Sequence, residues 1–371
     1  SLNEPLALPN QQECNFNLDR TEFLLFLSSL LYNRDDKMVH NAHETLSNLN
    51  LKKKIPTDKD LQTILKLLHD SENSIREQID QFDLKFTSIS ELNHLGGCYA
   101  GMFWSEKDNF IVVAFRGTTT TSFAQMLTDI SFQRMDARRY LFGKVHEGYY
   151  KSLFETNNSK HCAAIRMANT IRIKVAEINQ KNNLPVNLWI TGHSIGGAFA
   201  TLFYSWLMKS PTNLDENCIL RDAFTFASPA CVDNEFATQF SLLSNDPLNY
   251  GKNLWRIITD NDIIPRIPPT FDNQLLRRFT RRINVLNNSH IGNEVRFFHD
   301  GRKPISKQQH LFRNNELLKH GLKLNEFNTI MEISDSLNLQ NLISRPQRRL
   351  EFVEKSIPDC FLNHKSYRYF E

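Results

Sequence analysis

The sequence predicts an α/β fold in which a mostly parallel central sheet is flanked by helices. Short apolar runs alternate with helical patterns along the second half of the chain, and this alternation is typical of a parallel sheet with both faces covered. The expected strands cover residues 186–191, 223–227, 253–259 and 294–298, and the expected helices cover residues 195–208 and 233–243. Hydrophobic residues make up 40% of the 371 residues and charged residues 23%, which is the composition of a folded globular chain.

The first 95 residues predict a helical extension that packs on the main domain. Apolar residues recur at helical spacing in residues 19–33 and again in residues 58–82. We expect both stretches to be helical and amphipathic and to form a packing layer around the core. The main domain is then expected to span residues 96–371.

The main domain begins with a predicted hairpin. Two short β-rich runs, residues 98–104 and 110–115, flank the turn-like segment 105–109. A long helical region is expected over residues 147–180. Residues 300–355 have a charged, helical character, and we expect them to form a helical insertion before the C-terminus.

Charge and cysteine content exclude several classes of protein. Lys and Arg total 44 and Asp and Glu total 41, a net charge of +3, so nucleic acid is a poor candidate partner. No stretch reaches the roughly 18 consecutive apolar residues of a transmembrane helix. The six cysteines include no C-x-x-C pair, which removes support for a zinc ribbon. They leave open up to three disulfides or reduced core thiols.

The most informative segment is a G-x-S-x-G pattern at residues 192–196. It follows a buried-type strand and precedes a helix rich in small and apolar residues, which is the strand–turn–helix context of a nucleophile elbow. Gly192 and Gly196 remove side chains that would clash in the sharp turn. Ser194 then lies at a helix N-terminus, where the N–H of Ile195 points toward a developing oxyanion. The pattern predicts a serine nucleophile for acyl transfer.

Four further segments occur in order around this serine. They are I-V-V-A-F-R-G-T-T-T at 111–120, K-V-H-E-G-Y at 144–149, F-T-F-A-S-P at 224–229 and R-I-I-T-D-N-D-I-I-P at 256–265. Together with the serine motif they resemble the class 3 lipases, a fungal family of α/β-hydrolases, over about residues 97–300 and the last dozen residues. The resemblance implies the α/β-hydrolase fold and the hydrolysis of carboxylic esters.

The acid is expected in the D-I-I-P segment. An acyl-transfer serine needs a base, and the base needs an orienting carboxylate. The order on this fold is serine, acid, then histidine. Asp262 follows the expected strand 253–259 at the sheet edge where catalytic groups gather, and the D-I-I-P match favours it over Asp260.

Three of the histidines that follow Asp262 are candidates for the base. His364 lies in L-N-H-K-S-Y, which resembles the family's L-D-H-x-x-Y segment around its catalytic histidine, with Asn363 in place of the usual Asp. His290 resembles a structural histidine of the family, and His299 directly follows the last expected strand. We expect His364 to be the base, with His290 and His299 as the alternatives.

The resemblance also implies an oxyanion donor and a lid. It assigns a second oxyanion donor to Thr118, beside the N–H of Ile195, and it makes residues 119–132 a lid. The apolar positions of one helical face in this segment are Phe123, Met126, Leu127 and Ile130. Such a face covers the site in water and turns outward at a lipid surface. An ordinary surface helix with a core-facing stripe is the alternative.

These features predict a serine carboxylic-ester hydrolase, and we expect a lipase that acts on acylglycerol esters through an acyl-enzyme on Ser194. Alternatives with the same triad are phospholipase A1, sterol esterase and feruloyl esterase, and a remote one is a non-catalytic lipase-like binding protein. No metal or cofactor is implied, and the expected partner is a lipid or ester at an oil–water or membrane interface. Sequons at Asn157 and Asn287 favour secretion. The start at Ser1 suggests a processed or trimmed product whose missing segment could have carried a targeting signal. An intracellular, lipid-droplet or membrane-associated location is the alternative.

Overall fold

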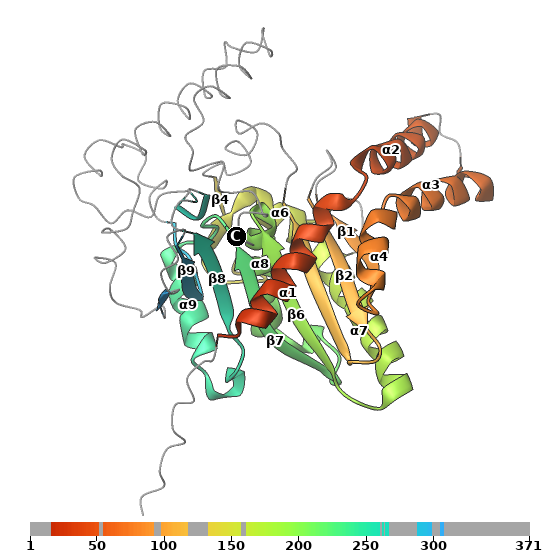
Figure 1. Cartoon of the computed structure of the whole chain (residues 1–371). Coiled ribbons are helices and arrows are strands. Elements are labelled where there is room, and N and C mark those ends of the chain that lie inside the picture. Colours follow the sequence, from red (N-terminus) through yellow and green to blue (C-terminus); the bar gives the residue numbers. More distant parts are fainter. Residues whose placement is uncertain are drawn as a thin grey trace, which may run out of the picture.

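An eight-stranded sheet forms the centre of the molecule in a computed structural model (Figure 1). The structure describes residues 16–51, 55–92, 98–117, 133–156, 161–259, 262, 264–266, 288–298 and 305–307. The strands, in their order across the sheet, are β1 (Lys85–Glu91), β2 (Tyr99–Ser105), β3 (Phe110–Arg116), β6 (Val186–His193), β7 (Cys218–Phe226), β8 (Leu254–Thr259), β9 (Asn293–Phe297) and β10 (Ile305–Lys307). A separate two-stranded sheet pairs β4 (Arg134–Asp136) with β5 (Lys144–His146).

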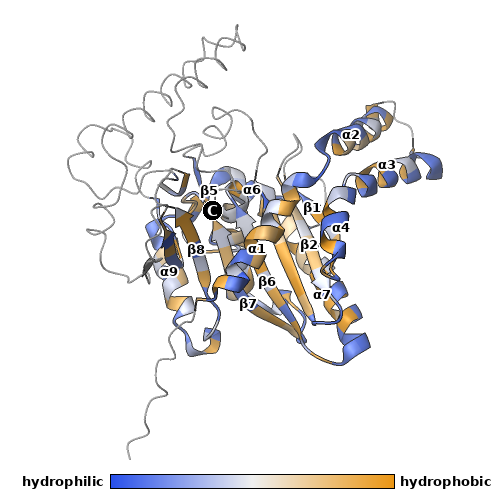
Figure 2. Cartoon of the chain, in the orientation of Figure 1, coloured by the Kyte–Doolittle hydropathy of each residue, from blue (hydrophilic) through white to orange (hydrophobic). Residues whose placement is uncertain are grey.

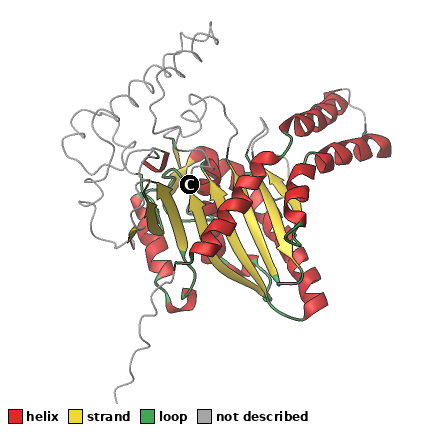
Figure 3. Ribbon diagram, in the orientation of Figure 1, coloured by secondary structure: helices red, strands yellow, loops and turns green. Residues whose placement is uncertain are grey.

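The central five strands pair in parallel, and each outer strand pairs antiparallel with its neighbour. Strands β3, β6, β7, β8 and β9 pair in parallel. Strand β2 pairs antiparallel with β1 and β3, as the expected hairpin requires, and β10 pairs antiparallel with β9. The predicted fold class, a mostly parallel sheet flanked by helices, is confirmed (Figure 3).

Helices cover both faces of the sheet. One face carries α6 (Glu147–Phe154), α7 (Ala163–Asn182), α8 (Ile195–Lys209) and α9 (Asn234–Ser244), and the other carries α1 (Leu18–Leu30) and α4 (Asn73–Asp80). Successive residues of β3 face opposite cores, since Ile111 and Val113 pack with α8 while Val112 and Ala114 pack with α1. This is why the strands read as continuous apolar runs in the sequence (Figure 2).

Helix α1 lies across the sheet and confirms the amphipathic helix expected at residues 19–33. Asn17 caps its first turn by accepting the N–H of Arg20, and the helix continues into the 3₁₀ turn η1 (Leu31–Asn33). Its carbonyl at Leu24 accepts the hydroxyl of Thr191 on β6. The N-terminal region is therefore hydrogen-bonded to β6, the strand that leads to Ser194.

The amphipathic stretch expected over residues 58–82 is helical, but it is not one continuous helix. It is divided into α3 (Asp58–Asp70) and α4, which are separated at Ser71 and Glu72. Both of these residues bond to other parts of the chain: the carbonyl of Ser71 accepts the N–H of Asp35, and the Glu72 carboxylate accepts the N–H of Ser88. Before them, α2 (Asp36–Leu51) and α3 form a hairpin that projects from the sheet (Figure 1).

Four strands were not expected. Strand β1 lies inside the stretch interpreted as helical, and it forms because its backbone pairs along β2 although its side chains show no regular alternation of burial. Strand β10 lies inside the segment 300–355 interpreted as helical, and its three residues pair with β9. Strands β4 and β5 are the other two, and they pair with each other in the small second sheet.

The possibility of three disulfides is also wrong. Cys162, Cys218 and Cys231 are free thiols, and burial raises the pKa of Cys218 and of Cys231 to about 12. Burial of a thiol in apolar surroundings disfavours the thiolate, so these two side chains are packing residues. Secretion stays a prediction. Within the described ranges, no helix is long and apolar enough to cross a membrane.

Candidate active site

Ser194 lies in a sharp turn between β6 and α8. Its backbone has φ 59° and ψ −133°. Residues other than glycine rarely adopt this conformation, and it stores strain of about 1–3 kcal/mol. The turn is held by two backbone hydrogen bonds, from the N–H of Ser194 to the carbonyl of Phe226 (2.9 Å) and from the N–H of Gly197 to the carbonyl of Ser194 (2.8 Å). This is the geometry of a nucleophile elbow.

The flanking glycines are required by close backbone contacts. A Cβ on Gly192 would lie 2.3 Å from the carbonyl oxygen of Gly196, and a Cβ on Gly196 would lie 2.1 Å from the carbonyl oxygen of Phe115. Both contacts are with backbone atoms, which cannot rotate away. The predicted role of the two glycines in the turn therefore rests on direct steric contact.

The end of β3 lies directly against the elbow. A Cβ on Gly117 would lie 3.1 Å from the nitrogen of Ile195 and 3.2 Å from the carbonyl oxygen of His193. The backbone nitrogen of Ile195, one of the two predicted oxyanion donors, thus lies close to Gly117. Ser194 and Ile195 are buried, with 5% and 2% of their surfaces exposed.

The N-terminal region reaches the elbow through Tyr32. A hydrogen bond of 3.0 Å joins the Tyr32 hydroxyl to Nδ1 of His193, the residue before Ser194, and the two rings pack edge to face. Burial raises the pKa of Tyr32 above its ordinary value, so the hydroxyl stays protonated. Sequence reasoning did not identify Tyr32, because a tyrosine at the end of an amphipathic helix carries no signal for a partner 161 residues away.

Arg116 anchors the start of the α2–α3 hairpin beside the same turn. Its side chain is 1% exposed, donates to the carboxylate of Asp36 (2.7 Å) and to the carbonyl of Leu31, and lies over the ring of Tyr99. A buried guanidinium needs such partners because an unpaired buried charge is costly. Residues of the N-terminal region therefore fix the position of Arg116, the first residue of the Arg-Gly pair before Thr118.

Asp262 lies at the same edge of the sheet as Ser194, two strands away. Ser194 follows β6 and Asp262 follows β8, and β7 lies between these parallel strands. At about 4.8 Å per strand the two chain segments are about 10 Å apart. Asp262 is 1% exposed, and one of its carboxylate oxygens accepts the N–H of Ile264 at 2.9 Å.

His290 forms a hydrogen bond to the loop that carries Asp262. Its Nε2 donates to the carbonyl of Pro265 at 2.6 Å. Burial, followed by the positive charge of Arg256, lowers the pKa of the ring to about 3. A general base works best with a pKa near the working pH, so this ring is suited to a structural role.

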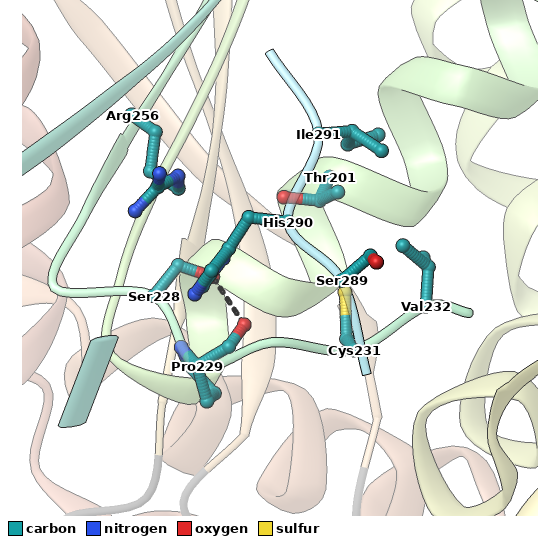
Figure 4. A pocket seen from close by; sticks show the side chains of 9 residues that line it. All are labelled: Thr201, Ser228, Pro229, Cys231, Val232, Arg256, Ser289, His290 and Ile291. Carbon is teal, nitrogen blue, oxygen red and sulfur yellow. Dashed lines mark hydrogen bonds between the residues drawn. The ribbon is translucent and has the colours of Figure 1, made fainter. Parts of the chain in front are cut away.

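A small pocket lies beside this histidine, between β7, α8 and the chain that enters β9 (Figure 4). It is lined by Thr201, Ser228, Pro229, Cys231, Val232, Arg256, Ser289, His290 and Ile291. Arg256 pairs with Glu294 at 2.5 Å. Burial alone would raise the pKa of Glu294, but the positive charges of Arg256 and Arg296 hold it at about 2. Strand β8, which precedes Asp262, and strand β9 are thus joined by a buried ion pair.

Several predicted residues lie outside the described part of the chain. These are His364, His299, Thr118, Asp260 and the lid positions Phe123, Met126, Leu127 and Ile130. Their roles stay predictions. Among the residues that the structure describes, no three His, Cys, Asp or Glu side chains are grouped as metal ligands.

Comparisons with known proteins bear on this geometry. Residues 112–272 match the family Lipase (class 3). Phospholipase A1-IIgamma of Arabidopsis thaliana is 27% identical over 171 residues, which cover 43% of this chain and 38% of that protein. Triacylglycerol lipase OBL1 of Arabidopsis thaliana is 25% identical over 189 residues, which cover 44% and 35%. The chain thus spans less than half the length of these relatives.

Among solved structures, the lipase from Rhizopus microsporus var. chinensis aligns with a TM-score of 0.45 at 17% identity. That alignment covers 84% of this chain and 86% of the other. A native Rhizomucor miehei lipase propeptide complex aligns with a TM-score of 0.45 at 21% identity, over 64% and 66% of the two chains. The family match includes β3, the elbow and Asp262, which are the parts of the site that the structure describes. The similarity to the class 3 lipase family therefore extends over residues 112–272, which is less than half of the chain.

Proposed function

We infer that the chain is a serine carboxylic-ester hydrolase that acts on lipid esters. The observation that carries this proposal is the strained backbone of Ser194 between β6 and α8, with Gly117 close to the backbone nitrogen of Ile195. A strained turn of this kind presents a hydroxyl at a helix N-terminus and places a backbone donor beside it. The family match supports the same chemistry.

The proposed reaction follows from these positions. His364 removes the proton of the Ser194 hydroxyl as the oxygen attacks the acyl carbonyl, and Asp262 orients the imidazole and stabilises its positive charge. A gap of about 10 Å between the chain segments of serine and acid suits two groups that are bridged by one imidazole and do not touch. The N–H groups of Ile195 and Thr118 hold the oxyanion. His364 then protonates the leaving alcohol, and water releases the acid from the acyl-enzyme.

The substrate class follows from the family and its relatives. One curated relative is named a phospholipase A1 and another a triacylglycerol lipase, so acylglycerols and phospholipids are the two leading candidates. We propose acylglycerols first, with the amphipathic segment 119–132 as a lid that opens at a lipid surface. Rates on trioleoylglycerol, a phospholipid and methyl ferulate would rank the lipase, phospholipase A1 and feruloyl esterase activities.

The test is the Ser194→Ala variant with a soluble nitrophenyl ester. We expect its kcat to fall by about 10⁴-fold or more, with the unfolding midpoint unchanged or raised, because the strained turn is kept and only the nucleophile is lost. A fluorophosphonate probe should label the wild-type protein at Ser194 and leave the variant unlabelled. Full activity in Ser194→Ala would overturn the proposal, and an unlabelled wild-type protein would favour the non-catalytic alternative.

A further inference from the structure

The hydroxyl of Tyr32 is bonded to both chain segments that lead to the predicted oxyanion donors. One segment is the end of β6 at His193, which the chain follows through the elbow to Ile195. The other is the end of β3 at Gly117, the residue before Thr118. Tyr32 belongs to neither segment. It lies in η1, at the end of the helix α1 that crosses one face of the sheet (Figure 1).

The two bonds of this hydroxyl use its oxygen and its proton. The oxygen lies 3.0 Å from Nδ1 of His193. Burial raises the pKa of Tyr32, and the positive charge of Arg116 and a hydrogen bond from the backbone of Gly117 oppose this rise. A hydrogen bond that lowers this pKa favours the phenolate, so the backbone group of Gly117 is its N–H. The Tyr32 oxygen therefore accepts from Gly117, and its own proton is left to donate to Nδ1 of His193.

This connection lies just beyond the point where the sheet stops joining the two strands. The pairing of β3 with β6 ends at Phe115 and Gly192. Gly117 is two residues further along one strand, and His193 is one residue further along the other. A Cβ on Gly117 would lie 3.2 Å from the carbonyl oxygen of His193, so the two backbones are close together here. The Tyr32 hydroxyl links them where the ladder no longer does.

The turn that carries Tyr32 is itself held in place on both sides. Before it, the carbonyl of Leu31 accepts the hydroxyl of Tyr99 at 2.9 Å. After it, the guanidinium of Arg34 pairs with the carboxylate of Glu91 at 2.6 Å, and only 2% of the Arg34 side chain is exposed. A side chain on a turn fixed in this way can hold its hydrogen-bonding partners in one position.

Position is decisive for an oxyanion donor. Such a donor has to lie about 2.7–3.1 Å from the oxyanion, and losing one costs about 10²–10³ in kcat. A displacement of about 1 Å can cost on the order of 10²-fold in rate. Without the Tyr32 hydroxyl, the N–H of Gly117 and Nδ1 of His193 lose the partner that they share. The spacing of the two segments then depends on weaker constraints.

We propose that Tyr32 is a positioning residue, whose hydroxyl sets the spacing between the segments at Gly117 and His193 and thereby aligns the oxyanion donors that follow them. The inference rests on the proposed function, because it assumes an oxyanion formed at Ser194. It gives the N-terminal region, which precedes the family match at residue 112, a part in catalysis.

The experiment compares Tyr32→Phe with Tyr99→Phe on a soluble nitrophenyl ester. Each variant loses one hydroxyl at the same turn, but the Tyr99 hydroxyl bonds to Leu31 within the N-terminal region. We expect Tyr32→Phe to lower kcat by about 10- to 10²-fold with KM changed less than about threefold, because the donors act in the transition state. Tyr99→Phe should keep kcat within about threefold of the wild-type value. Both variants should lower the urea midpoint of unfolding.

A fluorophosphonate probe gives a second readout, since its phosphoryl oxygen needs the same donors when Ser194 attacks phosphorus and fluoride leaves. The labelling rate should fall in Tyr32→Phe and stay at the wild-type rate in Tyr99→Phe. Wild-type kcat and labelling in Tyr32→Phe would overturn this inference and leave the proposed function standing. Equal losses of kcat in the two variants would also overturn it. A wild-type protein that is neither labelled nor active would instead overturn the proposed function.

Hydrogen exchange tests the contact without any turnover. The amide of Gly117 should be protected from exchange in the wild-type protein, because it donates to the Tyr32 hydroxyl. We expect that protection to be lost in Tyr32→Phe and retained in Tyr99→Phe. Rapid exchange of the Gly117 amide in the wild-type protein would overturn the inference even if the Tyr32→Phe protein did not fold.

Discussion

The two sides of the candidate active site, the side of the proposed nucleophile Ser194 and the side of the proposed acid Asp262, are built in different ways. On the nucleophile side, the turn at Ser194 is fixed by backbone contacts of Gly192 and Gly196 that leave no room for a side chain. On the acid side, the loop at Asp262 is fixed by hydrogen bonds from Ile264 and His290. Steric contacts between backbones tolerate no change of residue, whereas hydrogen bonds can be replaced by another group of the right shape. Substitutions on the two sides should therefore fail in different ways.

The largest expected effect is a loss of activity without a loss of stability, caused by a substitution on the acid side. Asp262→Asn keeps an oxygen that can accept the N–H of Ile264, so the free energy of unfolding should hardly change. The ester hydrolysis kcat/KM should fall by about 10⁴-fold, or about 5.5 kcal/mol, because an amide cannot stabilise the imidazolium. Asp260→Asn is the matched control and should cost less than about tenfold. A reversed order would assign the acid to Asp260.

The next largest effect is a loss of stability from a steric clash in the turn at Ser194. Gly196→Ala places a methyl group 2.1 Å from the backbone of Phe115, so either β3 or α8 must shift. We expect the free energy of unfolding in urea to fall by about 3 kcal/mol or more. In Gly148→Ala the new methyl meets only the His146 side chain, at 3.2 Å, so this change should cost less than about 1 kcal/mol. Wild-type stability in Gly196→Ala would show that the turn is not sterically fixed.

The smallest expected effect tests whether the hydrogen bond of His290 stabilises the loop at Asp262. His290→Gln retains an amide donor at the position of Nε2, whereas His290→Phe leaves the Pro265 carbonyl without this donor. The phenylalanine variant should lose about 1–3 kcal/mol of unfolding free energy, and the glutamine variant should lose less. Chemical denaturation at about pH 8, above the unfolded pKa of histidine, distinguishes them. Equal losses would mean that packing of the ring, and not its hydrogen bond, holds the loop.

Acid titration of the same variants adds a second readout. The pKa of His290 is lowered to about 3 in the folded chain, against about 6.5 when unfolded. Between these values the unfolded chain binds a proton that the folded chain does not, so stability falls as the pH decreases from about 6.5 to about 3. His290→Gln lacks this titration. Its stability deficit relative to the wild-type protein should therefore shrink as the pH is lowered through that range.

The sequence predicted the nucleophile side better than the acid side, for a physical reason. The turn at Ser194 is encoded by five consecutive residues between a strand and a helix, and each contact lies within a short motif or its neighbouring strand. The His290 contact to Pro265 joins residues 25 apart, and the Tyr32 contact to His193 joins residues 161 apart. Such pairs depend on the complete fold, so a single sequence carries no sign of them.

The secondary structure shows the same limit. Buried strands such as β3 and β8 were recognisable because their apolar residues are continuous. Strand β1 was missed because it is rich in polar residues and its side chains lack a regular burial pattern, so only its pairing with β2 defines it. The break between α3 and α4 likewise depends on bonds from Asp35 and Ser88 to the residues at the break.

Helix α1 shows that the part of the chain needed for folding begins before the part that matches the family. The family match begins at residue 112, yet one face of the sheet packs against residues that precede it, among them Leu24, Leu27 and Ile75. A fragment cut at the match would expose Val112, Phe224 and Phe226 to water and would lose the antiparallel edge of its sheet. Any minimal expressed unit should therefore begin at or before Asn17, the residue that caps α1.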